Sequence, residues 1–395
     1  MRCIDCGKTE GYDPPGFLCP KCGGLTELLQ RKRVSVDDLL PGRGAPSVWR
    51  YRASLPVGRG SDPVTLNEGG TPLVRSARLG PKLGLNRLFF KVEGQNPTGS
   101  FKDRGMTVAV TRAVESGAKV LVCASTGNTS ASLAAYASRA GLRSAVVLPS
   151  GKVAAGKLTQ AVAHGARLVR VEDNFDRALQ ITSKAVAISK SLYLMNSINP
   201  YRIEGQKTVA FEIFEQLGNR VPDYVVLPVG NAGNISAVWK GFSDLKKLGA
   251  TKTVPRLVGV QAEGASPMVE AYRQGRAPRP WTAPETVASA IRIGTPVSWK
   301  KAMAALRGSK GEALSVSDVE IVSARRSLSA SEGIFVENAS ATPIAALGKL
   351  KGIPKAATVV CITTGHGLKE PIPEDWSDTS PPTAKDEREL VRLLA

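Results

Sequence analysis

Short apolar segments alternate with amphipathic stretches along most of the chain after about residue 64. Apolar runs of strand length occur at 87–92, 119–123, 144–148, 167–171, 224–227, 256–260 and 358–362. Between them, apolar residues recur at helical spacing, for example at 210, 213, 214 and 217. The alternation predicts an α/β fold with mainly parallel sheets. The length of 395 residues predicts two to three domains, because a domain commonly has roughly 100–200 residues.

The turns that follow the predicted strands carry the candidate chemistry, because ligands of parallel α/β sheets bind at the carboxyl ends of the strands. The first such turn, at 96–105, reads NPTGSFKDRG and places Lys102 where a loop enters a helix that we expect to begin near Asp103. A partly desolvated lysine has a lowered pKa and can form a Schiff base with a carbonyl cofactor. The alternative is an exposed lysine beside Asp103.

Two further turns have the composition of anion-binding sites. Residues 125–129 read STGNT and precede a helix expected at 131–140; they favour a carboxylate, although Ser or Thr could also act only as a helix cap. Residues 230–234 read GNAGN and precede a helix expected at 236–246. Their glycines let the backbone approach a phosphate, and a plain left-handed turn is the alternative. The segment matches neither G-x-G-x-x-G nor the Walker A pattern.

A fourth turn at 363–369 reads TTGHGLK, and a hydroxyl there can bond a ring nitrogen. The chain has two histidines, His164 and His366, and we interpret both as structural. A Ser–His–Asp hydrolase or a histidine-ligated catalytic metal therefore has little support.

Four of the six cysteines form two Cys-x-x-Cys pairs, Cys3 with Cys6 and Cys19 with Cys22. Two such pairs make a tetrahedral S4 site that suits a structural Zn²⁺, with iron in a rubredoxin-like site as the alternative. Four thiolates leave no open coordination position, so we expect no catalytic role for the metal. Cys123 and Cys361 lie in apolar runs and are expected in the core.

The chain carries 53 Lys and Arg against 34 Asp and Glu, a net charge of +19. This charge indicates anionic partners such as phosphate esters, nucleic acid or acidic proteins, or a solvated basic surface with phosphate sites within it. No run of 18 apolar residues and no signal-peptide segment is present in the sequence, so we expect a cytoplasmic protein without membrane association.

Together the four turns resemble the threonine synthase family, pyridoxal-phosphate (PLP) enzymes of fold type II. Further segments agree: NSINPYR at 196–202, EGQK at 204–207 and AIRIG at 290–294. The resemblance spans roughly 64–370 and implies two α/β domains around a PLP cleft. It implies conversion of O-phospho-L-homoserine and water to L-threonine and phosphate, which is a carbon–oxygen lyase reaction of amino-acid biosynthesis.

The resemblance also implies a role for each site residue. Lys102 would form the internal aldimine and move protons, Asn128 would bond the 3′-oxygen of PLP, and Thr364 would bond its ring nitrogen. The PLP phosphate would lie against Gly230, Asn231, Ala232, Gly233 and Asn234. The substrate carboxylate would lie against Ser125, Thr126 and Thr129, and the substrate phosphate against Asn196, Ser197 and Arg202. The metal ligands would be Cys3, Cys6, Cys19 and Cys22.

The expected organisation has five parts. A zinc ribbon at 1–28 and a linker at 29–63 precede a large PLP-binding domain at 64–102 and 201–370. A smaller mobile α/β domain at 103–200 lies between the two halves of the large domain. A tail at 371–395 has a loosely ordered stretch at 371–383 and a short helix at 385–394. A homodimer is the expected assembly.

The sequence is also compatible with two alternative functions. Relatives such as cysteate synthase, threonine dehydratase and cysteine synthase share the lysine motif, and an enzyme acting on phosphoserine would also need a phosphate site. A zinc-ribbon nucleic-acid-binding protein would also explain the ribbon and the charge. An aromatic content of only 5% and the four glycine-rich turns make nucleic-acid binding the weaker interpretation.

Overall fold

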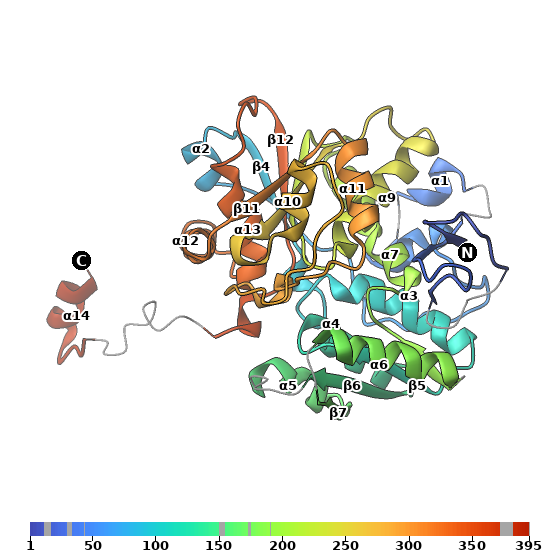
Figure 1. Cartoon of the computed structure of the whole chain (residues 1–395). Coiled ribbons are helices and arrows are strands. Elements are labelled where there is room, and N and C mark those ends of the chain that lie inside the picture. The colour runs from blue at the N-terminus through green and yellow to red at the C-terminus, as the bar shows by residue number, and fades with distance from the viewer. Residues whose placement is uncertain are drawn as a thin grey trace.

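The computed structural model describes residues 1–11, 17–29, 34–42, 44–149, 155–172, 175–189, 191–371 and 382–394. In these residues the strands form three sheets, of two, six and four strands. The two larger sheets lie one above the other in Figure 1, and the chain passes from the six-stranded sheet to the four-stranded one and back. The α/β fold with mainly parallel sheets is confirmed.

The six-stranded sheet has the order β11-β10-β9-β12-β4-β3, and only β3 runs antiparallel to its neighbour. Its strands are β3 (Leu73–Arg75), β4 (Arg87–Val92), β9 (Tyr224–Pro228), β10 (Arg256–Ala262), β11 (Glu312–Val316) and β12 (Thr358–Thr363). Val225 and Leu227 pack with helices α8 (Thr208–Gln216), α9 (Gly233–Lys247) and α11 (Trp299–Gly308). Val226 packs on the opposite face with α12 (Asp318–Glu332) and α13 (Asn338–Leu347). Burial on both faces explains why these strands read as continuous apolar runs.

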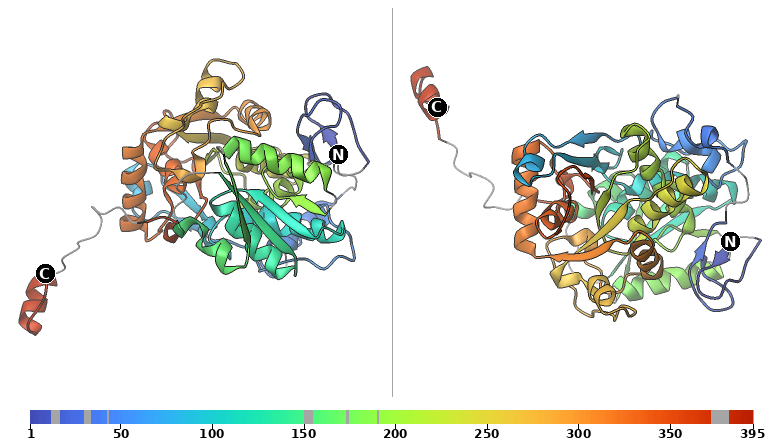
Figure 2. Two further views of the ribbon diagram at one scale, coloured as in Figure 1. Left: turned by 60° about the horizontal axis from the view of Figure 1, so that its bottom comes forward. Right: turned by 90° about the horizontal axis from the view of Figure 1, so that it is seen from above.

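The four-stranded sheet is parallel throughout and has the order β7-β6-β5-β8. Its strands are β5 (Val120–Ala124), β6 (Arg143–Pro149), β7 (Arg167–Val171) and β8 (Leu192–Leu194). The helices of this segment are α3 (Lys102–Glu115), α4 (Asn128–Arg139), α5 (Ala155–Ala163) and α6 (Phe175–Ile188), and they surround the sheet in the left view of Figure 2.

The remaining helices are α1 (Val36–Leu39), α2 (Leu79–Lys82), α7 (Pro200–Gln206), α10 (Pro267–Arg273) and α14 (Glu387–Leu394). Short 3₁₀ turns occur at Val48–Ser54, Glu93–Gln95, Glu263–Ala265, Ser289–Ile291 and Gly367–Lys369. The helix α14 stands apart from the body in Figure 1 and has no buried residue. Throughout the described ranges, each helix is too short or too polar to cross a bilayer.

All seven predicted strands are present, with ends that differ by at most two residues. The helices expected at 131–140, 236–246 and 385–394 begin at Asn128, Gly233 and Glu387. Strands β3, β8 and β11 were not predicted, because they are short or carry polar residues such as Glu312 and Ser315. Most of the stretch predicted to be loosely ordered, 371–383, lies outside the described residues.

The N-terminal segment packs directly on the body of the protein. Its strands β1 (Arg2–Cys3) and β2 (Thr26–Glu27) pair antiparallel. Phe17 makes edge contacts with Tyr193 and Tyr201, with ring centroids 5.3 and 6.1 Å apart. Both views of Figure 2 show this segment, in dark blue, on one side of the molecule near the N label.

A buried network of four charges joins the strand β4 region to helices α3 and α8. The Arg104 guanidinium contacts Glu93 at 2.6 Å and Glu212 at 2.6 Å, and the Lys91 ammonium contacts Glu212 at 2.7 Å. Arg104 also donates to the Thr71 hydroxyl at 2.9 Å. Two positive and two negative side chains thus compensate one another in the interior, where a lone charge would be strongly unfavourable.

Replacement of Arg104 by alanine is expected to lower the free energy of unfolding by about 3–5 kcal/mol, because Glu93 and Glu212 would be left buried without their shared partner. Denaturant unfolding measures the change. The matched control is Arg256→Ala, since Arg256 forms an exposed pair with Glu312 at 3.3 Å, and such pairs contribute at most about 1 kcal/mol. Equal effects of the two substitutions would contradict the assignment.

Candidate active site

A cavity of about 1020 Å³ lies where the carboxyl ends of strands from both large sheets meet. All four turns singled out in the sequence line it. The lining includes every predicted cofactor and substrate residue: Lys102, Ser125, Thr126, Asn128, Thr129, Asn196, Ser197, Arg202, Gly230, Asn231, Ala232, Gly233, Asn234 and Thr364. The structure therefore brings together residues that are up to 262 positions apart in the chain (102 to 364).

Lys102 is the first residue of α3 and is held by firmly bonded neighbours. Asp103 is buried and accepts hydrogen bonds from the Thr98 backbone N–H at 2.7 Å and from the Ser132 hydroxyl at 2.6 Å. The Phe101 N–H donates to the Thr364 carbonyl at 3.0 Å. These bonds fix the lysine loop against both α4 and the end of β12.

The electrostatic surroundings of Lys102 favour its neutral form. Burial, with a contribution from the positive charge of Arg202, lowers the pKa of its amine to about 7 against the opposing charge of Glu337. The Lys102 Nζ lies 4.1 Å from the centroid of the Phe101 ring. Near neutral pH, a large fraction of this amine is therefore available as a nucleophile or proton acceptor.

The turn before α9 forms an anion cradle. Ala232 has a left-handed backbone with φ of 64°, which directs the turn into the first residue of α9. A Cβ at Gly230 would lie 3.1 Å from the Ile291 Cα, so this position is closely packed by backbone. The buried Asn234 Nδ2 has no hydrogen-bond partner in the described part of the structure. Glycine backbone, a helix N-terminus and an unpaired amide are the features that a phosphate group requires.

A second anion-binding group lies in the same cavity on α7. The Arg202 side chain is buried, and its Nη1 donates to the Met195 carbonyl at 2.9 Å. Its Nε has no partner among the described residues. Burial lowers the pKa of the guanidinium to about 10, yet it stays charged at neutral pH. An unpaired, charged donor in a cavity favours binding of an anionic ligand.

Asn196 lines the cavity but is also bonded within the protein. Its Oδ1 accepts from the Ala124 N–H at 2.9 Å, and its Nδ2 donates to the Ala124 carbonyl at 2.8 Å. The side chain thus fixes the end of β5, from which the 125–129 turn begins. Contact of Asn196 with a substrate stays a prediction.

Two residues near the start of α13 belong to the site and were missed in the sequence. The Glu337 carboxylate is buried and accepts from the Asn128 amide at 2.9 and 3.0 Å. Burial, together with the charge of Glu370, raises the pKa of Glu337 to about 7. The Ser340 hydroxyl shares a hydrogen bond of 2.8 Å with the Thr364 hydroxyl. The sequence feature that could have pointed to this part of the site is the acidic residue Glu337 inside the apolar stretch 334–347.

Lys369 is a further cation of the cavity and reaches across it. It follows the Thr364 turn, and its Nζ donates to the side-chain Oε1 of Gln160 on α5 at 2.6 Å. His366 accepts the Leu368 N–H through Nδ1 at 3.2 Å, which agrees with a structural role.

The four N-terminal cysteines converge on one point. The thiol sulfurs of Cys3, Cys6, Cys19 and Cys22 all lie within 4.8 Å of one another. The closest pairs are Cys3 with Cys22 at 3.5 Å and Cys6 with Cys19 at 3.6 Å. Tetrahedral Zn²⁺ with bonds of about 2.3 Å needs sulfurs about 3.8 Å apart, so the cluster has the size of a metal site.

The class of protein follows from comparison with known families. A family model described as pyridoxal-phosphate dependent enzyme matches residues 64–365, and the chain belongs to this family. The cavity fits the cofactor: Lys102 can hold its aldehyde carbon, and the α9 cradle can hold its phosphate. The solved structure of maize serine racemase superimposes with a TM-score of 0.66, covers 75% of this chain and 88% of its own, and shares 24% identity, which supports the fold alone.

Within that family the chain is similar to threonine synthases. The threonine synthase of Methanocaldococcus jannaschii is 53% identical over 94% of this chain and 93% of its own length. The threonine synthase of Methanosarcina acetivorans is 51% identical over 94% of this chain and 92% of its own length. Both alignments extend well beyond the 64–365 family match.

The pKa of Lys102 predicts the pH dependence of covalent PLP attachment. The neutral amine reacts, so attachment to the PLP-free protein should be slow at low pH, half-maximal near pH 7 and constant above it. Borohydride trapping at a series of pH values measures the rate. An ordinary lysine, with a pKa of 10.5, would instead give a rate that still rises above about pH 9.

Glu337→Gln tests the bond between Glu337 and Asn128. Above its pKa of about 7, Glu337 is mainly ionised and only accepts, so it holds the Asn128 amide with its N–H groups oriented toward it; a glutamine also offers an N–H and permits the reversed orientation. We expect the substitution to weaken PLP binding about tenfold, as measured by absorbance titration of PLP-free protein. The control is Glu263→Gln, because Glu263 is exposed. Unchanged PLP affinity in Glu337→Gln would contradict this role.

Proposed function

We propose that the protein is a threonine synthase that converts O-phospho-L-homoserine and water to L-threonine and phosphate with PLP as cofactor. The high identity to threonine synthases over nearly the whole chain supports this function. The observation that carries it in the structure is the pair of anion-binding groups in one cavity, the α9 cradle and Arg202. One group suits the phosphate of the cofactor, and the other suits the phosphate of the substrate.

The chain's own groups account for cofactor binding. Lys102 supplies the amine that binds the aldehyde carbon, and residues 230–234 supply N–H donors to the phosphate. Asn128 donates to the ring oxygen, with its orientation held by Glu337. Thr364 offers a neutral hydroxyl to the ring nitrogen, which leaves that nitrogen unprotonated. Bound in this way, PLP supplies an electron sink for the pair left when a C–H bond of the amino acid breaks.

Substrate binding and proton transfer use the remaining groups. Ser125, Thr126 and Thr129 at the start of α4 suit the carboxylate of an amino acid. Arg202 and Ser197, which line the same cavity, suit the leaving phosphate, and Arg202 can stabilise its charge as the carbon–oxygen bond breaks. The free Lys102 amine, with a pKa of about 7, then takes the proton from the α-carbon.

The organisation around the site completes the proposal. The segment 103–200, with the four-stranded sheet, moves against the rest of the chain (64–102 and 201–370) and excludes water. The cysteine cluster of the 1–28 segment holds a structural zinc ion, with 29–63 as the connection. We propose a cytoplasmic homodimer.

The activity test follows product formation from O-phospho-L-homoserine with PLP-loaded protein. L-Threonine and phosphate should appear in equal amounts, and Lys102→Ala should abolish the reaction. Arg202→Gln should lower kcat/KM about 100-fold, since it removes a buried charged donor to phosphate, whereas the exposed Arg256→Gln should not.

A parallel assay with O-phospho-L-serine and sulfite distinguishes the enzyme from a cysteate synthase. Turnover of phosphoserine without turnover of phosphohomoserine would overturn the substrate assignment. A PLP-loaded protein that turns over neither compound would overturn the proposed function as a whole.

A further inference from the structure

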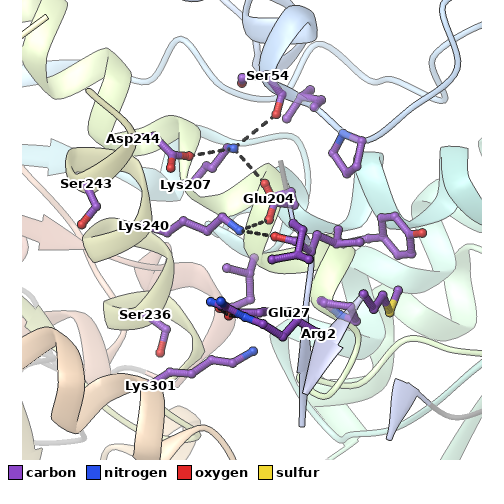
Figure 3. A pocket seen from close by; sticks show the side chains of 18 of the residues that line it. Arg2, Glu27, Ser54, Glu204, Lys207, Ser236, Lys240, Ser243, Asp244 and Lys301 are labelled. Atoms are coloured by element: carbon purple, nitrogen blue, oxygen red, sulfur yellow. Dashed lines mark hydrogen bonds and ion pairs between the residues drawn. The ribbon is translucent and has the colours of Figure 1, made fainter. Parts of the chain in front are cut away.

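A second cavity, of about 1050 Å³, lies between the N-terminal segment and the body. Helices α7, α9 and α11 form its wall on the body, and residues 27–29 and 53–57 form the facing wall. Figure 3 shows the side chains of Lys240, Ser236 and Lys301 along this wall, opposite Arg2 and Glu27. The second cavity shares Ile203 with the active-site cavity but none of the proposed cofactor or substrate residues.

Cationic side chains outnumber anionic ones in the lining. The cationic residues are Arg2, Arg112, Lys207, Lys240, Lys247 and Lys301, and the anionic residues are Glu27, Glu204 and Asp244. The cavity therefore has an excess of three positive charges among its lining side chains.

The three carboxylates of the lining are already paired. Glu204 contacts Lys207 at 2.8 Å and Lys240 at 2.5 Å, and Asp244 contacts Lys207 at 3.0 Å. Glu27 contacts Arg2 at 2.6 Å. Figure 3 shows the first of these groups as one connected set around Glu204. Among the described residues, these carboxylates form their direct ion pairs with cations other than Lys301.

Lys301 is a partly buried cation of the lining for which the described residues provide no direct ion pair. Its Nζ donates to the Thr26 carbonyl at 2.9 Å, whereas the carboxylates of the lining contact Arg2, Lys207 and Lys240. Burial lowers the pKa of its amine to about 8, and the nearby positive charge of Lys240 acts in the same direction, while Glu27 and Glu204 act against both. A partly desolvated ammonium gains more from an arriving anion than a hydrated one does.

The rest of the lining is suited to an apolar body attached to the anion. Leu28, Leu55, Pro56, Ile203 and Trp239 contribute apolar surface. Along α9, Ser236, Lys240, Ser243 and Lys247 lie at i, i+4, i+7 and i+11, so polar groups follow one face of the helix. Polar groups along one wall and apolar side chains elsewhere are typical of small-molecule sites.

We propose that this cavity is a second ligand site, which binds a small amphiphilic organic anion. The anionic group lies against Lys301 and Lys240, and the apolar part lies against Trp239 and Leu28. The site is independent of the PLP reaction, and its test does not depend on which substrate the enzyme uses.

The probe is 8-anilinonaphthalene-1-sulfonate, a sulfonate with an aromatic body that fluoresces in apolar surroundings. Titration of PLP-loaded protein should show one saturable site per chain by fluorescence and calorimetry. Lys301→Gln should weaken binding about tenfold, because the unpaired charge is lost. The matched control is Lys300→Gln, which removes the same charge from the adjacent residue; Lys300 does not line the cavity and pairs with Asp5 instead. It should leave the affinity within about twofold.

A second variant tests the cavity itself without touching a charge. Ala304 is exposed on the cavity wall of α11, so Ala304→Trp should fold normally, fill the space and abolish the saturable site. Unchanged absorbance of bound PLP in each variant verifies the fold. The proposal is overturned if the wild-type protein has no saturable site, if Lys301→Gln and Lys300→Gln bind equally, or if Ala304→Trp binds like wild type.

Discussion

The buried charges of Arg104, Glu93, Glu212 and Lys91 are the interaction on which the geometry of the site depends. Arg104 lies two residues after Lys102 in the first turn of α3, and its guanidinium bonds both carboxylates. Glu212 also accepts the Gly70 N–H at 2.8 Å, and Glu93 accepts the Thr71 hydroxyl at 2.6 Å. Because the donors and acceptors satisfy one another, the desolvation of four charges is offset, and α3 can take only one position against the sheet.

The electrostatics of the active-site cavity follow from this arrangement. With Arg104 neutralised behind it, Lys102 faces a cavity whose other charged side chains are the cations Arg202, Arg292 and Lys369 and the anions Glu337 and Glu370. Burial and the charge of Arg202 lower the pKa of its amine against the charge of Glu337, and the cations of the cavity attract phosphate groups. One cavity thus combines a reactive amine with binding of anions.

The sequence alone predicted the parts of the fold and site that depend on local pattern. The central strands were predictable because burial on both faces selects continuous apolar runs, such as VVCI at 359–362 in β12. The four turns were predictable because glycine and hydroxyl residues gather at the ends of those strands. Glu337 and Ser340 were not, since their contacts with Asn128 and Thr364 join segments 209 and 24 residues apart. The second cavity could not be predicted either, because its charged residues come from helices and from the N-terminal segment, which are brought together only by folding.

The crossing of α3 and α7 has a mechanical consequence. A Cβ at Gly205 would lie 1.9 Å from the Arg104 carbonyl oxygen, and one at Gly105 would lie 2.7 Å from the Arg202 carbonyl oxygen. The two backbones are in contact at these glycines, which lie between the turns that bear Lys102 and Arg202. A side chain at Gly105 or Gly205 would push the two helices apart and separate the Lys102 amine from the Arg202 guanidinium. The two helices therefore cannot separate without breaking this backbone contact, so the two glycines set the spacing between Lys102 and Arg202 in the cavity.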